Sequence, residues 1–233
     1  MNYGEIEKQT FKTFLAFAGL VITIVLLFFN ITSNFYRVSN ITYINDTDLS
    51  KTSLEKLMGT SIWLVDDTYF DSFYQANPSV EKISIIKELP NTLVIDVTVS
   101  DKLAYIQDNR QSPPRVFVLH KNLYIDDVET NTGLLSVKIS NGPVREGFYE
   151  EVVTFVMTLN KYSINISNVD LEFDGTSIFA THFNSNFDLG DPSDLARKAS
   201  VVGYYLTEEP CDGEIRLVYS EEGNEIRAVS NCN

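Results

Sequence analysis

The sequence predicts an α+β protein in three parts: an N-terminal single transmembrane helix, a small β-α-α-β-β domain, and a mixed β-domain with flanking helices. Three observations support this. A long apolar run lies near the N-terminus, segments with alternating apolar residues recur through the rest of the chain, and patterns of helical period lie among them. Strands and helices without a regular βαβ alternation are typical of the α+β class.

Residues 14–31 are predicted to form the transmembrane helix, because Phe14 to Phe29 contains no charged or strongly polar residue. At ~1.5 Å per residue, the run with Phe11 and Ile31 added is just long enough for a hydrocarbon layer of ~30 Å. The alternative is a cleaved signal peptide. Bulky residues follow the run, however, where a cleavage site needs small ones.

The charges around this helix predict its orientation. Lys8 and Lys12 precede it and Arg37 follows it, so we expect residues 1–13 to be a cytoplasmic tail and the domains to be extracytoplasmic. The formal net charge is −14, and Lys and Arg do not cluster. We therefore expect a membrane protein with a single span that does not bind nucleic acid.

Residues 38–104 are predicted to form the β-α-α-β-β domain. Strands are expected at 38–44, 80–87 and 92–100, and the turn between the last two contains Pro90. Two helices should follow the first strand. The first has apolar residues at helical spacing and ends at Gly59; the second is capped by Asp66 or Asp67. Their apolar residues are Leu49, Leu54, Leu57 and Met58 for the first helix and Tyr69, Phe70, Phe73 and Tyr74 for the second.

Residues 105–233 are predicted to form the β-domain. Strands are expected at 116–125, 134–139, 167–173 and 177–183, and a helix at 146–160 that buries Phe148, Val152, Val156 and Leu159. A second helix should begin at the segment 191–194, with Asp191 as N-cap and Pro192 at the first helical position. Its buried face would hold Leu195, Ala199, Val202 and Leu206.

The chain ends in a predicted hairpin with strands at 214–219 and 225–229 around the turn 220–224. If Ser220 faces Asn224, then Cys211 and Cys232 fall within one register step of facing each other. We predict a disulfide at the base of this hairpin; the alternative is two unpaired thiols. The last strand should lie at the edge of its sheet, where free backbone groups accept an incoming strand.

The sequence offers little for catalysis. It contains only two histidines, His120 and His182, and no Gly-x-Ser-x-Gly, His-Glu-x-x-His or Gly-rich phosphate motif. His182 lies within an alternating run, and His120 has no neighbouring Cys or His with which to bind a metal. We therefore expect no enzyme activity, no catalytic residues, no metal site and no cofactor.

Several short motifs in order behind the apolar helix resemble the POTRA domain of the bacterial cell-division proteins FtsQ and DivIB. They are Ser61-Ile62-Trp63-Leu64-Val65, the P-x-V of residues 78–80, Leu89-Pro90-Asn91-Thr92-Leu93 and the I-x-V of residues 95–97. In the second domain, Leu189-Gly190 and the I-x-L-x-Y of residues 215–219 resemble the β-domain of this family. Two departures are Ser100-Asp101, where the family commonly has Glu-Arg, and residues 120–124 in place of D-x-x-G.

The resemblance implies a non-enzymatic scaffold of the division machinery, or divisome, at the septum of the dividing cell. It implies that the last strands bind FtsB (DivIC in other lineages) together with FtsL, and that the POTRA domain contacts other membrane division proteins. Tyr219 matches the family's aromatic position. The residues expected to bind the partner are Tyr219, Arg216, Ile226, Arg227, Ala228 and Val229.

Two other functions remain open at the level of sequence. A POTRA-bearing assembly or translocation component would normally carry repeated POTRA units or a transmembrane β-barrel. A membrane-anchored sensor that binds a small ligand would be expected to add a cytoplasmic signalling domain, whereas only about thirteen residues precede the apolar run. Both alternatives agree less well with the order of segments than the division scaffold does.

Overall fold

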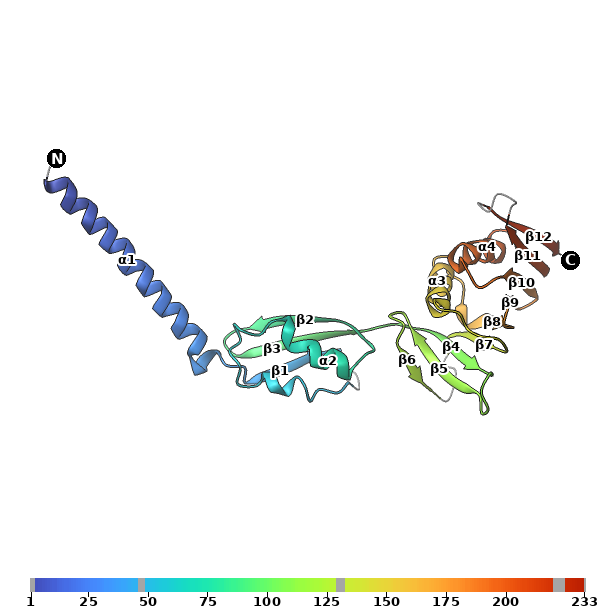
Figure 1. Cartoon of the computed structure of the whole chain (residues 1–233), viewed down its shortest axis with the longest axis horizontal. Helices are drawn as coiled ribbons and strands as arrows, with labels where there is room; N and C mark the ends of the chain where they lie inside the picture. Colours follow the sequence, from blue (N-terminus) through green and yellow to red (C-terminus); the bar gives the residue numbers. More distant parts are fainter. Residues whose placement is uncertain (1–2, 46–48, 129–132, 220–224, 233) are drawn as a thin grey trace. The chain divides into compact units, whose positions relative to one another are not determined.

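The computed structural model describes residues 3–45, 49–128, 133–219 and 225–232 (Figure 1). Contacts between Cα atoms divide the chain into two compact units, residues 1–99 and 100–233. The boundary lies earlier than the expected end of the first domain at residue 104. The reason is that residues 102–104 pair with strands of the second unit, as part of β4.

Helix α1 (Tyr3–Thr32) contains the predicted transmembrane segment. Within it, Phe11–Thr32 is long and apolar enough to cross a membrane, and the described part of the chain has one such helix. Its apolar side chains are exposed and pack on nothing else in the protein, as expected for a surface that lipid covers. The helix begins in the predicted tail, because no proline interrupts residues 3–13.

The rest of the first unit is a three-stranded sheet of β1 (Asn40–Ile44), β2 (Val80–Glu88) and β3 (Thr92–Val99). The order is β1-β3-β2, with β1 parallel and β2 antiparallel to the central strand. The strand expected at 92–100 is present as β3, and its residues Leu93, Ile95 and Val97 all lie in the core of this unit. The α+β class agrees with the prediction.

The first predicted helix of this unit differs from the structure. Instead of an α-helix over residues 49–58, there is a short 3₁₀ helix, η2 (Glu55–Leu57), with backbone bonds from Leu57 N to Leu54 O and from Met58 N to Glu55 O. Leu54 and Leu57 are fully buried, whereas Met58 is half exposed. Two buried residues three positions apart suit a 3₁₀ turn, in which side chains at i and i+3 align.

The second predicted helix is present as η3 (Asp67–Phe70) followed by α2 (Asp71–Ala76). The Asp66 side chain accepts a hydrogen bond from Thr68 N at 3.1 Å, so the predicted cap is confirmed. Phe70 and Phe73 are buried in the core of the unit. A further 3₁₀ turn, η1 (Asn34–Tyr36), joins α1 to this unit.

The second unit is built on one nine-stranded sheet with the order β12-β11-β10-β9-β8-β7-β4-β5-β6. Helices α3 (Phe148–Asn160) and α4 (Leu195–Thr207) share one core with the inward-facing strand residues, and Figure 1 shows them on the same side of the sheet. The short 3₁₀ helix η4 (Ile166–Asn168) precedes β8. The strands are β4 (Lys102–Asp108), β5 (Arg115–His120), β6 (Ile125–Asp127), β7 (Leu135–Ile139), β8 (Val169–Phe173), β9 (Ile178–His182), β10 (Ser185–Gly190), β11 (Gly213–Tyr219) and β12 (Ile226–Cys232).

The predicted strand at 116–125 is instead a hairpin of β5 and β6. Its turn is closed by the bond from Leu123 N to His120 O, and Leu123 has a positive φ of 67°. The Asn122 side chain accepts a hydrogen bond from Tyr124 N at 3.2 Å. Asparagine side chains stabilise turns in this way, and this signal was overlooked within an otherwise apolar run.

The predicted start of α4 is wrong by several residues. The helix begins at Leu195, after Asp194 in the left-handed region with a φ of 55°, so Asp191 is not its N-cap. The cap comes from helix α3, because the Glu151 carboxylate accepts hydrogen bonds from Asp194 N at 3.2 Å and Leu195 N at 2.7 Å. A carboxylate supplied from another helix satisfies the free N–H groups that a local cap would otherwise serve.

Candidate partner-binding surface

Strand β12 lies at one end of the nine-stranded sheet. Its inner side pairs with β11 over seven positions, from Gly213 opposite Cys232 to Tyr219 opposite Ile226. No described strand pairs with its outer side. The predicted edge position of residues 225–229 is therefore found, and the strand continues to Cys232. Such an edge presents backbone N–H and C=O groups to an incoming strand.

A disulfide joins Cys211 and Cys232, whose Cα atoms are 5.2 Å apart. It ties the end of the edge strand to the segment before β11. That segment is held to β10 as well, because the Ser185 hydroxyl donates a hydrogen bond to Cys211 O at 2.8 Å. The register of the hairpin differs by one residue from the expected facing of Ser220 and Asn224, and both of these lie outside the described residues.

The residues expected to bind the partner lie on two faces of the sheet. Ile226 and Ala228 pack against the core that the helices cover, whereas Arg227 and Val229 point to the open face, and Val229 is 61% exposed. Tyr219 is the cross-strand neighbour of Ile226. The expected apolar set of Tyr219, Ile226 and Val229 is thus divided, because successive side chains of a strand alternate between faces.

Helix α4 fixes the position of Tyr219. The Tyr219 hydroxyl donates a hydrogen bond to Asp194 Oδ2 at 3.4 Å, and the Lys198 ammonium lies 5.5 Å from the centre of its ring. Burial, together with the Asp194 carboxylate, raises the pKa of the Tyr219 hydroxyl. The ring still exposes 41% of its surface. An aromatic side chain held from one side and open on the other is suited to contact a partner at low entropic cost.

Lys198 is almost completely buried, and its ammonium group donates a hydrogen bond to Asp191 O. Burial lowers the pKa of Lys198, and the carboxylates of Asp191, Asp194 and Glu151 oppose this effect. Lys198 was not among the site residues predicted from the sequence. Lys198 lies three residues after Leu195 and four before Val202, on the apolar face of α4, and this spacing indicates that its side chain is buried.

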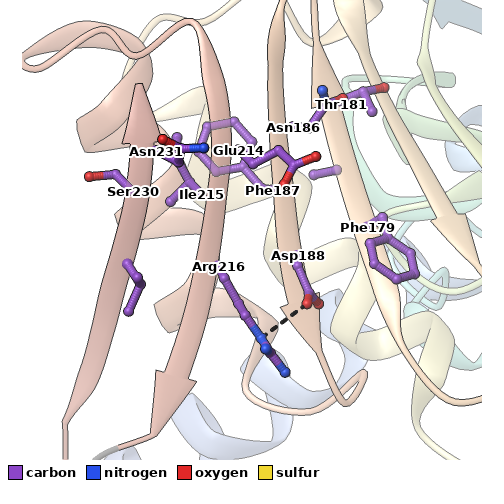
Figure 2. Close-up of a pocket in the computed structure, with 12 residues that line it drawn as sticks. Phe179, Thr181, Asn186, Phe187, Asp188, Glu214, Ile215, Arg216, Ser230 and Asn231 are labelled. Atoms are coloured by element: carbon purple, nitrogen blue, oxygen red, sulfur yellow. Dashed lines mark ion pairs between the residues drawn. The ribbon is translucent and has the colours of Figure 1, made fainter. Parts of the chain in front are cut away.

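The open face of the sheet contains a hollow of about 530 Å³ over β9, β10, β11 and β12. Figure 2 shows Phe179 and Asp188 on one side of it and Arg216 on the strand next to the edge. Arg216 Nε lies 3.4 Å from Asp188 Oδ2, so the predicted partner-binding arginine already has an acidic neighbour in its own chain. The Arg216 side chain is 72% exposed and that of Asp188 33%, and an ion pair open to solvent in this way contributes little to stability.

A second groove of about 370 Å³ lies at the same edge on the helix side. Its lining comes from α4 and from the start of β12, and consists of Arg197, Ser200, Val201, Glu225 and Ile226. The edge strand therefore has a hollow on each face. A partner that adds a strand to β12 would find room for side chains or flanking segments on both sides.

Neither histidine belongs to a recognisable chemical site. His120 is buried, and its Nδ1 lies 3.0 Å from Ser100 O. His182 lies on β9, where burial lowers its pKa. Over the described residues, no cluster of three His, Cys, Asp or Glu side chains has the arrangement of a metal site.

Residues 37–98 match the family model described as "POTRA domain, FtsQ-type". The match covers all three strands of the first unit together with η2, η3 and α2. It confirms the resemblance of this domain to the POTRA domain of the FtsQ and DivIB family. No curated protein matches the chain.

Proposed function

We propose that this chain, which carries an FtsQ-type POTRA domain behind a single-pass membrane anchor, is a non-enzymatic scaffold of the bacterial division machinery. Its mechanism is assembly. A chain confined to the membrane meets other membrane-bound partners at a high local concentration, so modest contacts on two units combine into a stable complex.

We place the N-terminus in the cytoplasm and both folded units outside the membrane, at the division septum. Lys8, Lys12 and Arg37 support this orientation. The disulfide between Cys211 and Cys232 supports it too, because disulfides persist in oxidising compartments outside the cytoplasm. In this arrangement the POTRA domain lies nearest the bilayer, where it can contact other membrane division proteins.

The edge strand β12 is the proposed binding site for the partner. An FtsB-like or DivIC-like protein, with an FtsL-like protein, adds a strand to the outer side of β12. The exposed parts of Tyr219 and Val229 supply apolar contacts, and Arg216 and Arg227 meet acidic side chains. Ile226 and Ala228 contribute through the backbone, because their side chains pack on the protein's own core.

Two neighbouring proline substitutions, Ala228→Pro and Val229→Pro, test strand addition. In an antiparallel ladder, successive residues direct their N–H groups alternately toward the paired strand and away from it. Proline removes the N–H group. One of the two variants should therefore break the β11–β12 pairing, whereas the other alters only the free edge.

The edge variant should keep the circular dichroism spectrum and melting temperature of the unaltered chain and should lose copurification of the FtsB-like or DivIC-like protein from membrane extracts. If the variant that keeps its stability also keeps the partner, strand addition at β12 is wrong.

A fluorescent fusion of the full chain that spreads evenly over the membrane of dividing cells would contradict the septal role.

A further inference from the structure

Large apolar side chains are exposed on the first unit immediately after α1. Phe35 is 62% exposed, Met58 50%, Trp63 44% and Leu64 52%. We call these four residues, together with the half-buried Tyr36, the juxtamembrane cluster. Exposed apolar side chains are unfavourable in water, and those that gather on one surface mark interaction sites.

Backbone hydrogen bonds hold the two segments that carry the cluster beside each other. Ile62 N donates to Tyr36 O at 2.8 Å, Val38 N donates to Thr60 O at 2.9 Å, and Gly59 N donates to Val38 O at 2.8 Å. The Tyr36 and Trp63 rings lie 5.7 Å apart, and the Phe35 and Tyr36 rings 5.1 Å apart. Residues 58–64 are therefore held beside residues 36–38, although they are distant in sequence.

The cluster lies close to the membrane surface because a short stretch of chain links it to the end of the membrane helix. Phe35 is three residues after Thr32, the last residue of the apolar helix, so it lies at most ~11 Å from that end even in a fully extended chain. The actual connection is tighter, because Ser33 N donates to Phe29 O and Tyr36 N to Ser33 O. The polar layer of a bilayer is roughly 5 to 8 Å deep on each side of the hydrocarbon core.

We propose that the juxtamembrane cluster inserts into the interfacial layer of the bilayer leaflet in which α1 ends. This proposal rests on the proposed membrane anchoring of α1. Tryptophan and tyrosine are enriched at this depth, because their rings are apolar and their N–H and O–H groups remain hydrogen-bonded. The Arg37 guanidinium, which donates to Gly59 O at 3.2 Å, lies beside the cluster, where its charge can remain among the headgroups.

The consequence concerns how the POTRA domain meets the membrane. A single helix by itself leaves the following domain free to swivel about its last turn. A second contact through Trp63 and Leu64, which follow the Ile62 that is hydrogen-bonded to Tyr36 at the start of the domain, removes that freedom. The domain then presents one constant face toward the membrane and the opposite one toward its partners.

The protein contains its own probe for this contact, because Trp63 is the only tryptophan in the sequence. The full chain is inserted into phosphatidylcholine vesicles whose lipids are either unlabelled, brominated near the headgroup, or brominated deep in the acyl chain. Bromine quenches tryptophan fluorescence at short range. We expect blue-shifted emission and a loss of fluorescence that is larger with the shallow bromines than with the deep ones.

The double variant Trp63→Phe/Phe183→Trp is the matched control. It moves the single tryptophan to a position in the second unit where the native aromatic side chain is 78% exposed. Its emission should be that of an indole in water, without quenching. The variant Leu64→Asp, which keeps Trp63 but adds a charge beside it, should show less quenching than the unaltered chain.

Extraction of the vesicles with alkaline carbonate separates the two proposals. If the chain stays with the vesicles but Trp63 is quenched no more than the control tryptophan, the interfacial contact is wrong and the anchor stands. If the chain is extracted, both the anchor and the contact are wrong. Quenching that is stronger with the deep bromines would also overturn the interfacial placement.

Discussion

The Glu151 carboxylate of helix α3 accepts a 2.7 Å hydrogen bond from the backbone N–H of Leu195, the first residue of helix α4. This bond sets where α4 begins, and Asp194, immediately before it, accepts the hydrogen bond from Tyr219. A chain of contacts thus runs from α3 through the start of α4 to the strand beside the sheet edge. The proposed binding edge is supported by residues that do not themselves lie on it.

Replacing Glu151 with alanine should lower the free energy of unfolding of the second unit by about 1 to 2 kcal/mol, because two backbone N–H groups at the start of α4 lose their acceptor. Urea unfolding of the detergent-solubilised chain, followed by circular dichroism, measures this. The matched control is Glu150→Ala, at the exposed neighbouring position. Equal losses in both variants would show that the cap contributes nothing specific.

The second unit should lose stability in acid through Asp108. The Arg110 guanidinium donates two hydrogen bonds to the Asp108 carboxylate, from Nε at 2.8 Å and from Nη2 at 2.6 Å. These bonds lower the pKa of Asp108, whose side chain is almost completely buried. A carboxyl group with a lowered pKa in the folded state contributes stability that is fully present above its unfolded pKa of about 3.9. That contribution is lost as the pH falls through the lowered value.

The variant Asp108→Asn should therefore unfold with a shallower dependence on pH below about 4 than the unaltered chain. Melting temperatures measured between neutral and acidic pH test this. Asp101→Asn, at an exposed position, serves as the control and should keep the original slope. An unchanged slope in the Asp108 variant would show that the ion pair does not link folding to pH.

The two faces of the edge strand should respond differently to a charge. Val229→Glu places the charge at a side chain that is 61% exposed, so the melting temperature should stay nearly unchanged while partner binding weakens about tenfold. Ile226→Glu puts the same charge against the core and should lower the melting temperature clearly. The affinity of each variant is measured by titration with the purified partner. Normal binding by Val229→Glu would contradict the assignment of Val229 to the partner-binding face.

Reduction of the bond between Cys211 and Cys232 should raise the intact mass by two daltons and free the end of β12. In the chain-entropy model, a loop with a sequence separation of 21 residues contributes about 3 kcal/mol to stability. The double variant Cys211→Ser/Cys232→Ser should unfold at lower urea concentration and should weaken partner binding through the loosened edge. Identical urea midpoints with and without reductant would contradict this contribution.

Most of the secondary structure of this protein could be predicted from local patterns. Strand β3, the buried stripe of α3 and the cap at Asp66 each depend on a few consecutive residues, and each was found where expected. Two of the mistakes occurred where contacts outside the local pattern decide. The start of α4 depends on Glu151, which is more than forty residues away in the sequence. The 3₁₀ form of η2 depends on which of its apolar residues the core accepts.

By itself, the sequence indicated an apolar helix near the N-terminus, strands and helices of the α+β class behind it, and a terminal hairpin whose cysteines lie close in register, because periodicity and spacing are local properties. The FtsQ-type POTRA domain was indicated by resemblance to a known family. Only the tertiary structure decided that the predicted partner-binding side chains divide between two faces of the sheet, and that Trp63 lies beside Tyr36 just after the membrane helix. Strand order and the packing of distant segments arise from contacts across the whole fold, and no short stretch of sequence contains them.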